Sequence, residues 1–124
     1  MNNLNFLCEQ FAKIFNGKSN INQGVCSVSL RRNINVFVQG RPSTSVIPVG
    51  ISFESLDQNG NALNLGEIAI LQEEIPLFIQ SIVQQGIIVS ALHIQSVEPP
   101  LSFAKKLANS FSVLSSYPIT DNGG

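Results

Sequence analysis

The chain has 124 residues and a formal net charge of −1, and only 12% of its residues are charged whereas 44% are hydrophobic. A chain of this length fits one domain with its own buried core. The composition excludes a disordered chain, which needs low hydrophobicity and high net charge. A net charge near zero also gives no electrostatic basis for binding nucleic acid or an anionic membrane. We therefore expect a single domain over residues 1–124 and neither of these partners.

The first half of the chain predicts one helix followed by four strands. Apolar residues at helical spacing predict a helix over 4–15. Period-two patterns predict strands over 25–30, 33–39 and 46–53, with a break at 40–43. The sequence Asp57-Gln58-Asn59-Gly60 predicts a hairpin turn, because Asn-Gly supplies the positive φ that such turns require. A return strand is expected over 63–71.

The second half predicts two helices, over 73–85 and 100–114. Between them, residues 87–92 form a continuous apolar run, which predicts a buried central strand, and residues 94–97 form a strand-like fragment. We expect residues 115–124 to be a flexible tail. This order predicts an α+β fold, with an antiparallel or mixed sheet and helices packed on one face. We expect four residues of the last two helices to be buried: Phe78, Ile82, Leu107 and Phe111.

The compartment is predicted from the N-terminal residues and the two cysteines. The residues before Cys8 lack the cationic and apolar stretches of an export signal, and no apolar run reaches the ~20 residues of a membrane-spanning helix. We therefore expect a cytoplasmic protein in a reducing setting. Cys8 and Cys26 form no C-x-x-C pair, so we expect them to be unbridged, buried and not catalytic.

His93, the single histidine, follows the apolar run and is the main candidate for chemistry. It is a candidate general base or metal ligand, with Glu67 and Glu73 as candidate carboxylate partners. The alternative for His93 is a histidine bonded to backbone at a strand end. The alternative for Glu73 and Glu74 is that they are acids that stabilise a helix N-terminus. A metal site needs three or four ligands within reach, and one histidine with separated carboxylates does not supply them.

Other motifs add little chemistry. Arg31, Arg32 and Arg41 form a candidate anion-binding patch or, alternatively, a solvated sheet edge that discourages pairing with another sheet. The chain has no P-loop, G-x-G-x-x-G or G-x-S-x-G motif, and we expect no cofactor.

Several motifs, in order and spacing, resemble the LppY/LpqO family, a bacterial domain family without an established activity. The resemblance covers nearly the whole chain, and these residues carry it: Gly24-Val25, Arg32, Val38-x-Gly40, Phe53, Leu65-Gly66-Glu67, Leu71 to Pro76, Gly86 to His93, and Pro100 to Leu107. Relatives in that family sometimes carry the name peptide methionine sulfoxide reductase. That reaction needs an exposed cysteine of low pKa, and neither cysteine has a comparable nucleophile context.

One departure from the family lies at His93, where relatives continue with a second histidine, a polar connection and a further strand. Here His93 passes directly into residues 94–98. Residues 94–97 are expected to be too close in sequence to fold back beside the run over 87–92, because a hairpin turn consumes at least two residues. We therefore expect a chain break at Leu92–His93 or His93–Ile94 with a mobile hairpin tip missing; the alternative is a lost hairpin.

Two functions are compatible with these features. The first is a binding module for a small molecule or protein that self-associates, as a homodimer, through its uncharged apolar surface. The second is an enzyme with its site at the end of the 87–92 strand. It would use His93 with Glu67 or Glu73, with or without a metal, or would be the reductase named for some relatives.

Overall fold

The computed structural model describes residues 3–90 and 93–120. Its elements in chain order are α1 (Asn3–Ile14), β1 (Ser19–Asn22), β2 (Val25–Val38), β3 (Arg41–Glu54), β4 (Ala62–Glu67), the 3₁₀ helix η1 (Gln72–Glu74), α2 (Ile75–Gln84), β5 (Ile88–Ser90), β6 (His93–Glu98), α3 (Pro100–Ser110), the 3₁₀ helix η2 (Phe111–Val113) and β7 (Ile119–Thr120). Among these helices, none has the length and apolarity needed to cross a bilayer.

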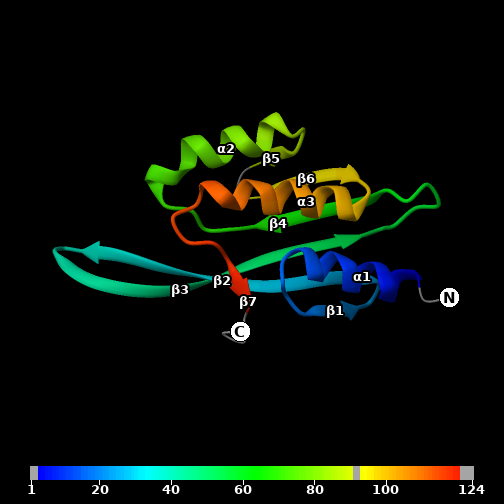
Figure 1. Ribbon diagram of the computed structural model, residues 1–124, viewed down its shortest axis with the longest axis horizontal. Helices are drawn as coiled ribbons and strands as arrows, with labels where there is room; N and C mark the ends of the chain where they lie inside the picture. The colour runs from blue at the N-terminus through cyan, green and yellow to red at the C-terminus, as the bar shows by residue number, and fades with distance from the viewer. Residues whose placement is uncertain (1–2, 91–92, 121–124) are drawn as a thin grey trace.

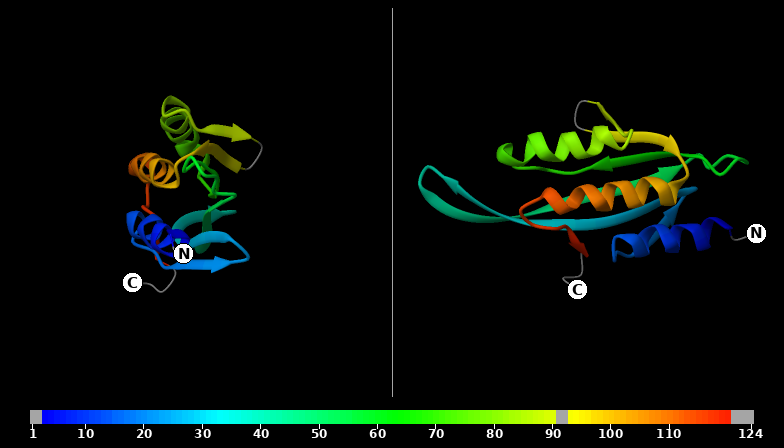
Figure 2. Two further views of the ribbon diagram at one scale, coloured as in Figure 1. Left: turned by 90° about the vertical axis from the view of Figure 1, so that its right-hand side faces the viewer. Right: turned by 45° about the horizontal axis from the view of Figure 1, so that its top comes forward.

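The described strands form one antiparallel sheet in the order β1-β2-β3-β4-β6-β5, with β7 paired to β2 (Figure 1). The helices lie together on one side of this sheet and leave its other side open (Figure 2). The expected α+β fold with helices on one face is confirmed, and the sheet is antiparallel rather than mixed.

The core fills the space between the helices and the sheet. The rings of Phe11 and Phe53 lie 4.9 Å apart, and Phe11 also contacts Phe15 at 5.6 Å, so α1 is joined to β3 by aromatic packing. The expected burial of four apolar side chains is confirmed. Phe78 and Ile82 of α2, Leu107 of α3 and Phe111 of η2 are each at most 1% exposed.

Strand β2 runs without a break through Arg31 and Arg32, where the sequence pattern suggested two strands. The period-two burial simply continues through Arg32, which is fully buried. The β2–β3 turn falls at Gln39 and Gly40, whose φ values of 51° and 78° fit a two-residue hairpin. Strand β3 therefore begins at Arg41, five residues before the strand that was expected over 46–53.

The apolar run over 87–92 is not a buried central strand, and that expectation was wrong. Its described part forms the short β5, which pairs only with β6 among the described strands and lies at the edge of the sheet. Ile88 is 57% exposed and Val89 is 36% exposed. A run of apolar residues is compatible with burial on both faces, but the pairing partner of β4 turned out to be β6.

The argument for a missing hairpin is contradicted by the same pairing. Strands β5 and β6 are antiparallel neighbours, with Ser90 opposite His93, Val89 opposite Ile94 and Ile88 opposite Gln95, so residues 93–95 do fold back beside the apolar run. The expected break at His93–Ile94 is wrong, because both residues lie within the continuous strand β6. The Leu92–His93 junction includes a residue outside the described part of the chain.

Cys8 and Cys26 form a disulfide, so the expectation of unbridged cysteines was wrong. The apolar stripe of α1 packs against β2, which brings the two Cα atoms to 5.6 Å, within the range for a disulfide. Both residues are 0% exposed, so their expected burial is confirmed. The prediction failed because it rested on an assumed compartment, whereas the contact between helix and strand decides which sulfurs meet.

Residues 115–120 also differ from the expected flexible tail. Ile119 and Thr120 of β7 pair with Arg31 and Leu30 of β2, which ties this segment to the sheet. The rest of that expected tail, residues 121–124, lies outside the described residues.

Candidate functional site

A shallow hollow lies on the open face of the sheet, the face that the helices do not cover. Its volume is about 350 Å³. Most of the side chains on its floor are small or polar. The lining residues that belong to this face alternate with buried neighbours along each strand. They are Val25, Ser27 and Ser29 from β2, Gly50 and Ser52 from β3, Leu65 and Glu67 from β4, and His93 from β6.

Gly50 lines this hollow between Ser29 and Glu67, and nothing in the chain itself requires a glycine there. It pairs with Ser29 on β2 and with Glu67 on β4, and the β2–β3 register runs past it without a bulge. It is not among the glycines with positive φ. A Cβ atom built at this position would meet no atom within 4 Å. The space above Gly50 is therefore open to another molecule.

The structure brings together two of the residues proposed from the sequence, His93 and Glu67. The distance from His93 Nδ1 to Glu67 Oε2 is 3.5 Å, and the two side chains are 50% and 67% exposed. The antiparallel register of β4 and β6, with Gly66 opposite Ile94, places them side by side on the open face. The pair is an ion pair when the imidazole is protonated.

Glu73, the third residue proposed from the sequence, does not belong to this site. It is exposed on η1 and does not line the hollow. Its neighbour Glu74 is buried on the opposite side of the sheet, among the helices. The carboxylates that are close in sequence are thus separated by the sheet, because Glu67 ends a strand on the open face and Glu74 precedes α2.

Glu74 instead forms a buried pair with Arg32. Two parallel hydrogen bonds join the guanidinium to the carboxylate, from Nη1 to Oε1 at 2.9 Å and from Nη2 to Oε2 at 2.7 Å. Arg32 also donates to the carbonyl oxygens of Ala69 and Ser116. Glu74 accepts further hydrogen bonds from the N–H of Leu71 and from the N–H and hydroxyl of Ser115. Both buried side chains of this pair therefore have several hydrogen-bond partners.

The charge on Glu74 is held by these donors. Burial alone would raise the pKa of its carboxyl, but hydrogen bonds from Arg32, Ser115 and Leu71 outweigh burial and lower the pKa to about 2. The pair connects β2 to the start of α2 and to the segment after η2. The pair therefore stabilises the fold.

The burial of Arg32 also removes the anion-binding patch that was considered for Arg31, Arg32 and Arg41. Arg32 is 0% exposed and its donors are occupied by protein atoms, so it presents no charge at the surface. The alternative, a solvated sheet edge formed by the three arginines, is also wrong for Arg32, because this side chain is buried. The one sequence signal for this pair is the position of Arg32, which is in phase with the buried residues of its strand.

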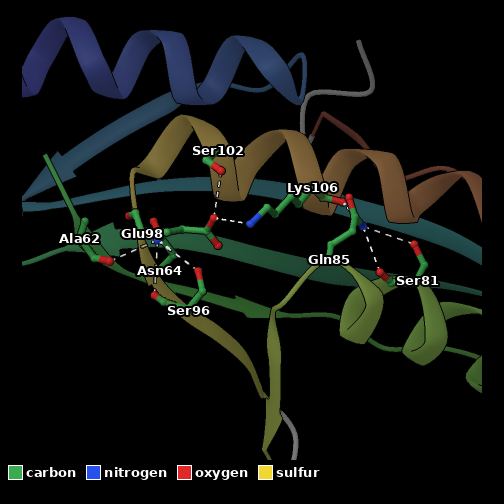
Figure 3. Close-up of polar contacts among 8 residues, drawn as sticks. All are labelled: Ala62, Asn64, Ser81, Gln85, Ser96, Glu98, Ser102 and Lys106. Carbon is green, nitrogen blue, oxygen red and sulfur yellow. Dashed lines mark hydrogen bonds and ion pairs between the residues drawn. The ribbon is translucent and has the colours of Figure 1, made fainter.

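A second polar cluster, shown in Figure 3, fixes α3 to the neighbouring strand. Glu98, at the end of β6, accepts hydrogen bonds from Lys106 Nζ at 2.7 Å and from the Ser102 hydroxyl at 2.9 Å. Burial raises the pKa of Glu98, but the hydrogen bonds from Lys106, Ser96 and Ser102 lower it further than burial raises it. These contacts lie on the helix-covered side and orient the first turns of α3.

Two side-chain amides, one buried and one partly buried, complete this cluster (Figure 3). Asn64 is 0% exposed, and its Nδ2 donates to the carbonyl oxygens of Ala62 at 3.2 Å and Glu98 at 3.0 Å. Gln85 follows α2, and its Nε2 donates to Ser110 Oγ at 2.8 Å and to the Lys106 carbonyl at 3.0 Å, which connects α2 to α3. Sequence reasoning missed both residues, although Asn64 sits in phase with the buried positions of β4.

As a candidate metal ligand, His93 has one neighbouring carboxylate, that of Glu67. Within residues 3–90 and 93–120, no three His, Cys, Asp or Glu side chains are grouped so as to hold a metal ion. His93 and Glu67 supply two donors, fewer than the three or four protein ligands usual for zinc.

An apolar groove of about 280 Å³ runs between α2 and the strands at the β5 edge. Its lining is almost entirely aliphatic or aromatic: Ile68, Ile70, Ile75, Phe78, Ile79, Val89 and Ile94, with Gly66 and His93. We call this the β5-edge groove. It contains no formally charged side chain at neutral pH.

A family model described as a Domain of Unknown Function (DUF1259) matches residues 9–109. By its fold, the protein is an α+β domain whose sheet has one face covered by helices and one face open. By the family match, the chain belongs to this family of unknown function. No curated protein and no solved structure matches the chain.

Proposed function

We propose that the protein is a binding module that holds a small ligand on the open face of its sheet. The observation that carries this proposal is Gly50. Glycine in a strand interior weakens the strand, and where no bulge requires it, it marks a place where a ligand or another backbone approaches closely. The open space above Gly50, in the lining of a hollow, supports a ligand there.

The side chains around Gly50 indicate the chemistry of that ligand. The hydroxyls of Ser27, Ser29 and Ser52 can donate and accept hydrogen bonds. Glu67 is the one formally charged side chain in the lining at neutral pH, and it accepts only. We therefore propose a small ligand that carries hydrogen-bond donors, such as an amine or hydroxyl groups, with its donors toward Glu67.

Binding is favoured over catalysis because the His93–Glu67 pair is open to solvent. Acid–base sites commonly place their groups in unequal environments, so that burial and neighbours separate their pKa values. Here both side chains are at least half exposed. Their 3.5 Å contact nevertheless supports a second candidate, an enzyme in which Glu67 orients His93 as a general base. Glu73 has no part in that candidate, and neither has a reductase, since Cys8 and Cys26 are buried in their disulfide.

The test is a titration of ¹⁵N-labelled protein with a panel of small amines and polyols, followed by NMR. We expect shift changes centred on Gly50, Ser29 and Glu67, and their loss in Gly50→Val, whose side chain would fill the hollow. Glu54→Val is the matched control, because Glu54 lies on β3, in phase with Gly50 but outside the hollow. A ligand that binds Gly50→Val as well as it binds the wild type would contradict the proposal.

Two finer expectations belong to the same proposal, whereas a third, the cytoplasmic location, does not. We propose that the family of unknown function is the one resembled above, the LppY/LpqO family, and that the protein is a homodimer. The cytoplasmic location stays a prediction. The Cys8–Cys26 bond supports an oxidising compartment instead, where disulfides form and persist.

A further inference from the structure

We infer that the homodimer forms at the β5 edge, where β5 of one copy pairs antiparallel with β5 of a second copy and the two β5-edge grooves close on each other. This inference rests on the proposed self-association and names its surface.

The first support is the distribution of charge. Residues 75–97, which include α2, β5 and most of β6, contain no Asp, Glu, Lys or Arg. Exposed strand edges are usually protected against pairing by charges or proline. The described outer side of β5 has no such residue, so pairing of this edge is not opposed.

The second support is an apolar stripe that opens at the same edge of the molecule. Ile75, Ile79 and Val83 follow each other at intervals of four along α2, and Ile75 and Val83 are 42% and 55% exposed. The opposite side of α2 contacts α3 through Ser81, so the stripe faces away from α3. Figure 2 shows α2 and β5 together at this edge, and Val89 of β5 lies beside the stripe in the β5-edge groove.

The third support is that the surface suits its own copy. A two-fold axis through Val89 is the register that pairs all three residues of β5, with Ile88 opposite Ser90 of the other copy. The same axis brings the two α2 stripes toward each other. A different protein partner is commonly selected by complementary charge, and this edge offers none, whereas an uncharged apolar surface meets an identical one without repulsion.

The first experiment measures oligomeric state by sedimentation equilibrium. We expect a wild-type dimer, and we expect Val83→Lys to raise the dissociation constant by about 100-fold or more, because the substitution acts twice across the axis. Leu77→Lys is the matched control: Leu77 is 58% exposed on the same helix but lies off the stripe. Val83→Ser tests the surface without adding charge, and circular dichroism checks that each variant is folded.

The second experiment is crosslinking. Antiparallel neighbours on a two-fold axis have Cα atoms about 4.5–5.5 Å apart, close enough for a disulfide. Val89→Cys is therefore expected to form a covalent dimer on mild oxidation, and Leu77→Cys is not. A wild-type dimer that Val83→Lys and Leu77→Lys leave equally intact would overturn this surface while the proposed homodimer stands. A monomeric wild type would overturn both.

Discussion

The two faces of the sheet use similar residues in opposite ways. On the covered face, the Glu74 carboxylate is 4% exposed and is held by Arg32 and by backbone donors. On the open face, the Glu67 carboxylate is 67% exposed, and His93 is its one ion-pair partner in the described chain. A carboxylate next to a cationic partner is thus a structural element where it is buried, and a group free to bind a ligand where it is exposed.

The glycines repeat this contrast. Gly66 belongs to the covered side, and a Cβ atom there would lie 2.8 Å from Ile94 Cγ1, so packing requires a glycine. Gly50 lies one strand away on the open side, and a Cβ atom there would meet nothing within 4 Å. Stability is therefore concentrated on one face, and the other face is available for function.

The largest expected effect is the loss of Glu74. Glu74→Ala leaves the Arg32 guanidinium buried without its counter-charge, and we expect the free energy of unfolding to fall by about 3–5 kcal/mol. Glu67→Ala, on the open face, is expected to change stability by less than about 0.5 kcal/mol. Urea denaturation of both variants checks the contrast. Equal effects would mean that burial does not distinguish the two carboxylates.

Removal of the disulfide is expected to rank next. The bond closes a loop with a sequence separation of 18, and the entropy of such a loop in the unfolded chain corresponds to about 3 kcal/mol. The double variant Cys8→Ser, Cys26→Ser is therefore expected to unfold at lower denaturant. Thiol titration of the unfolded wild type gives the control: two free thiols before reduction would show that the bond is absent.

Acid should destabilise the protein through the covered face. The pKa of Glu74 is lowered from 4.5 to about 2 in the folded state. Its charge therefore contributes stability above pH 4.5, and this contribution, about 3 kcal/mol, is lost as the pH falls from 4.5 to 2. Glu74→Gln is expected to be less stable at neutral pH and to lack this part of the acid dependence. A variant with the same pH profile as the wild type would contradict this assignment.

The smallest expected effects are those of alanine substitutions at the two glycines, which should change stability in opposite directions. Gly66→Ala is expected to lower stability by about 1–3 kcal/mol, because Ile94 must move. Gly50→Ala is expected to raise stability by about 0.5–1 kcal/mol, since alanine loses less conformational freedom on folding and has room here. Thermal unfolding measures both. A destabilised Gly50→Ala would give Gly50 a structural role and remove the main support for the ligand site.

Much of the fold could be predicted from local patterns. The spacing of apolar residues located three helices, and Phe78, Ile82, Leu107 and Phe111 are buried as expected. The turn at Asp57 was also recognisable, because Gly60 takes a φ of 86° and the Asp57 carboxylate accepts hydrogen bonds from the N–H groups of Asn59 and Asn61. These features depend on contacts between residues close together in the sequence.

The candidate site was only partly predictable. Glu67 and His93 were both identified, but Glu73 was included with them, and Gly50 was not among the candidate residues. A serine- and glycine-rich strand face looks like an ordinary solvated surface until the register shows which residues share a hollow. Gly50, Glu67 and His93 come from three strands, and only strand order brings them together.

The helices, the tight turns and the α+β class follow from local sequence patterns, because periodicity and turn chemistry act within a few residues. The tertiary structure decided everything that depends on distant partners. It placed β6 between β4 and β5, joined Cys8 to Cys26, and buried Arg32 against Glu74, 42 residues away. The physical reason is that an isolated pattern shows whether a residue prefers burial, whereas the long-range packing of helices on the sheet decides which groups are buried together.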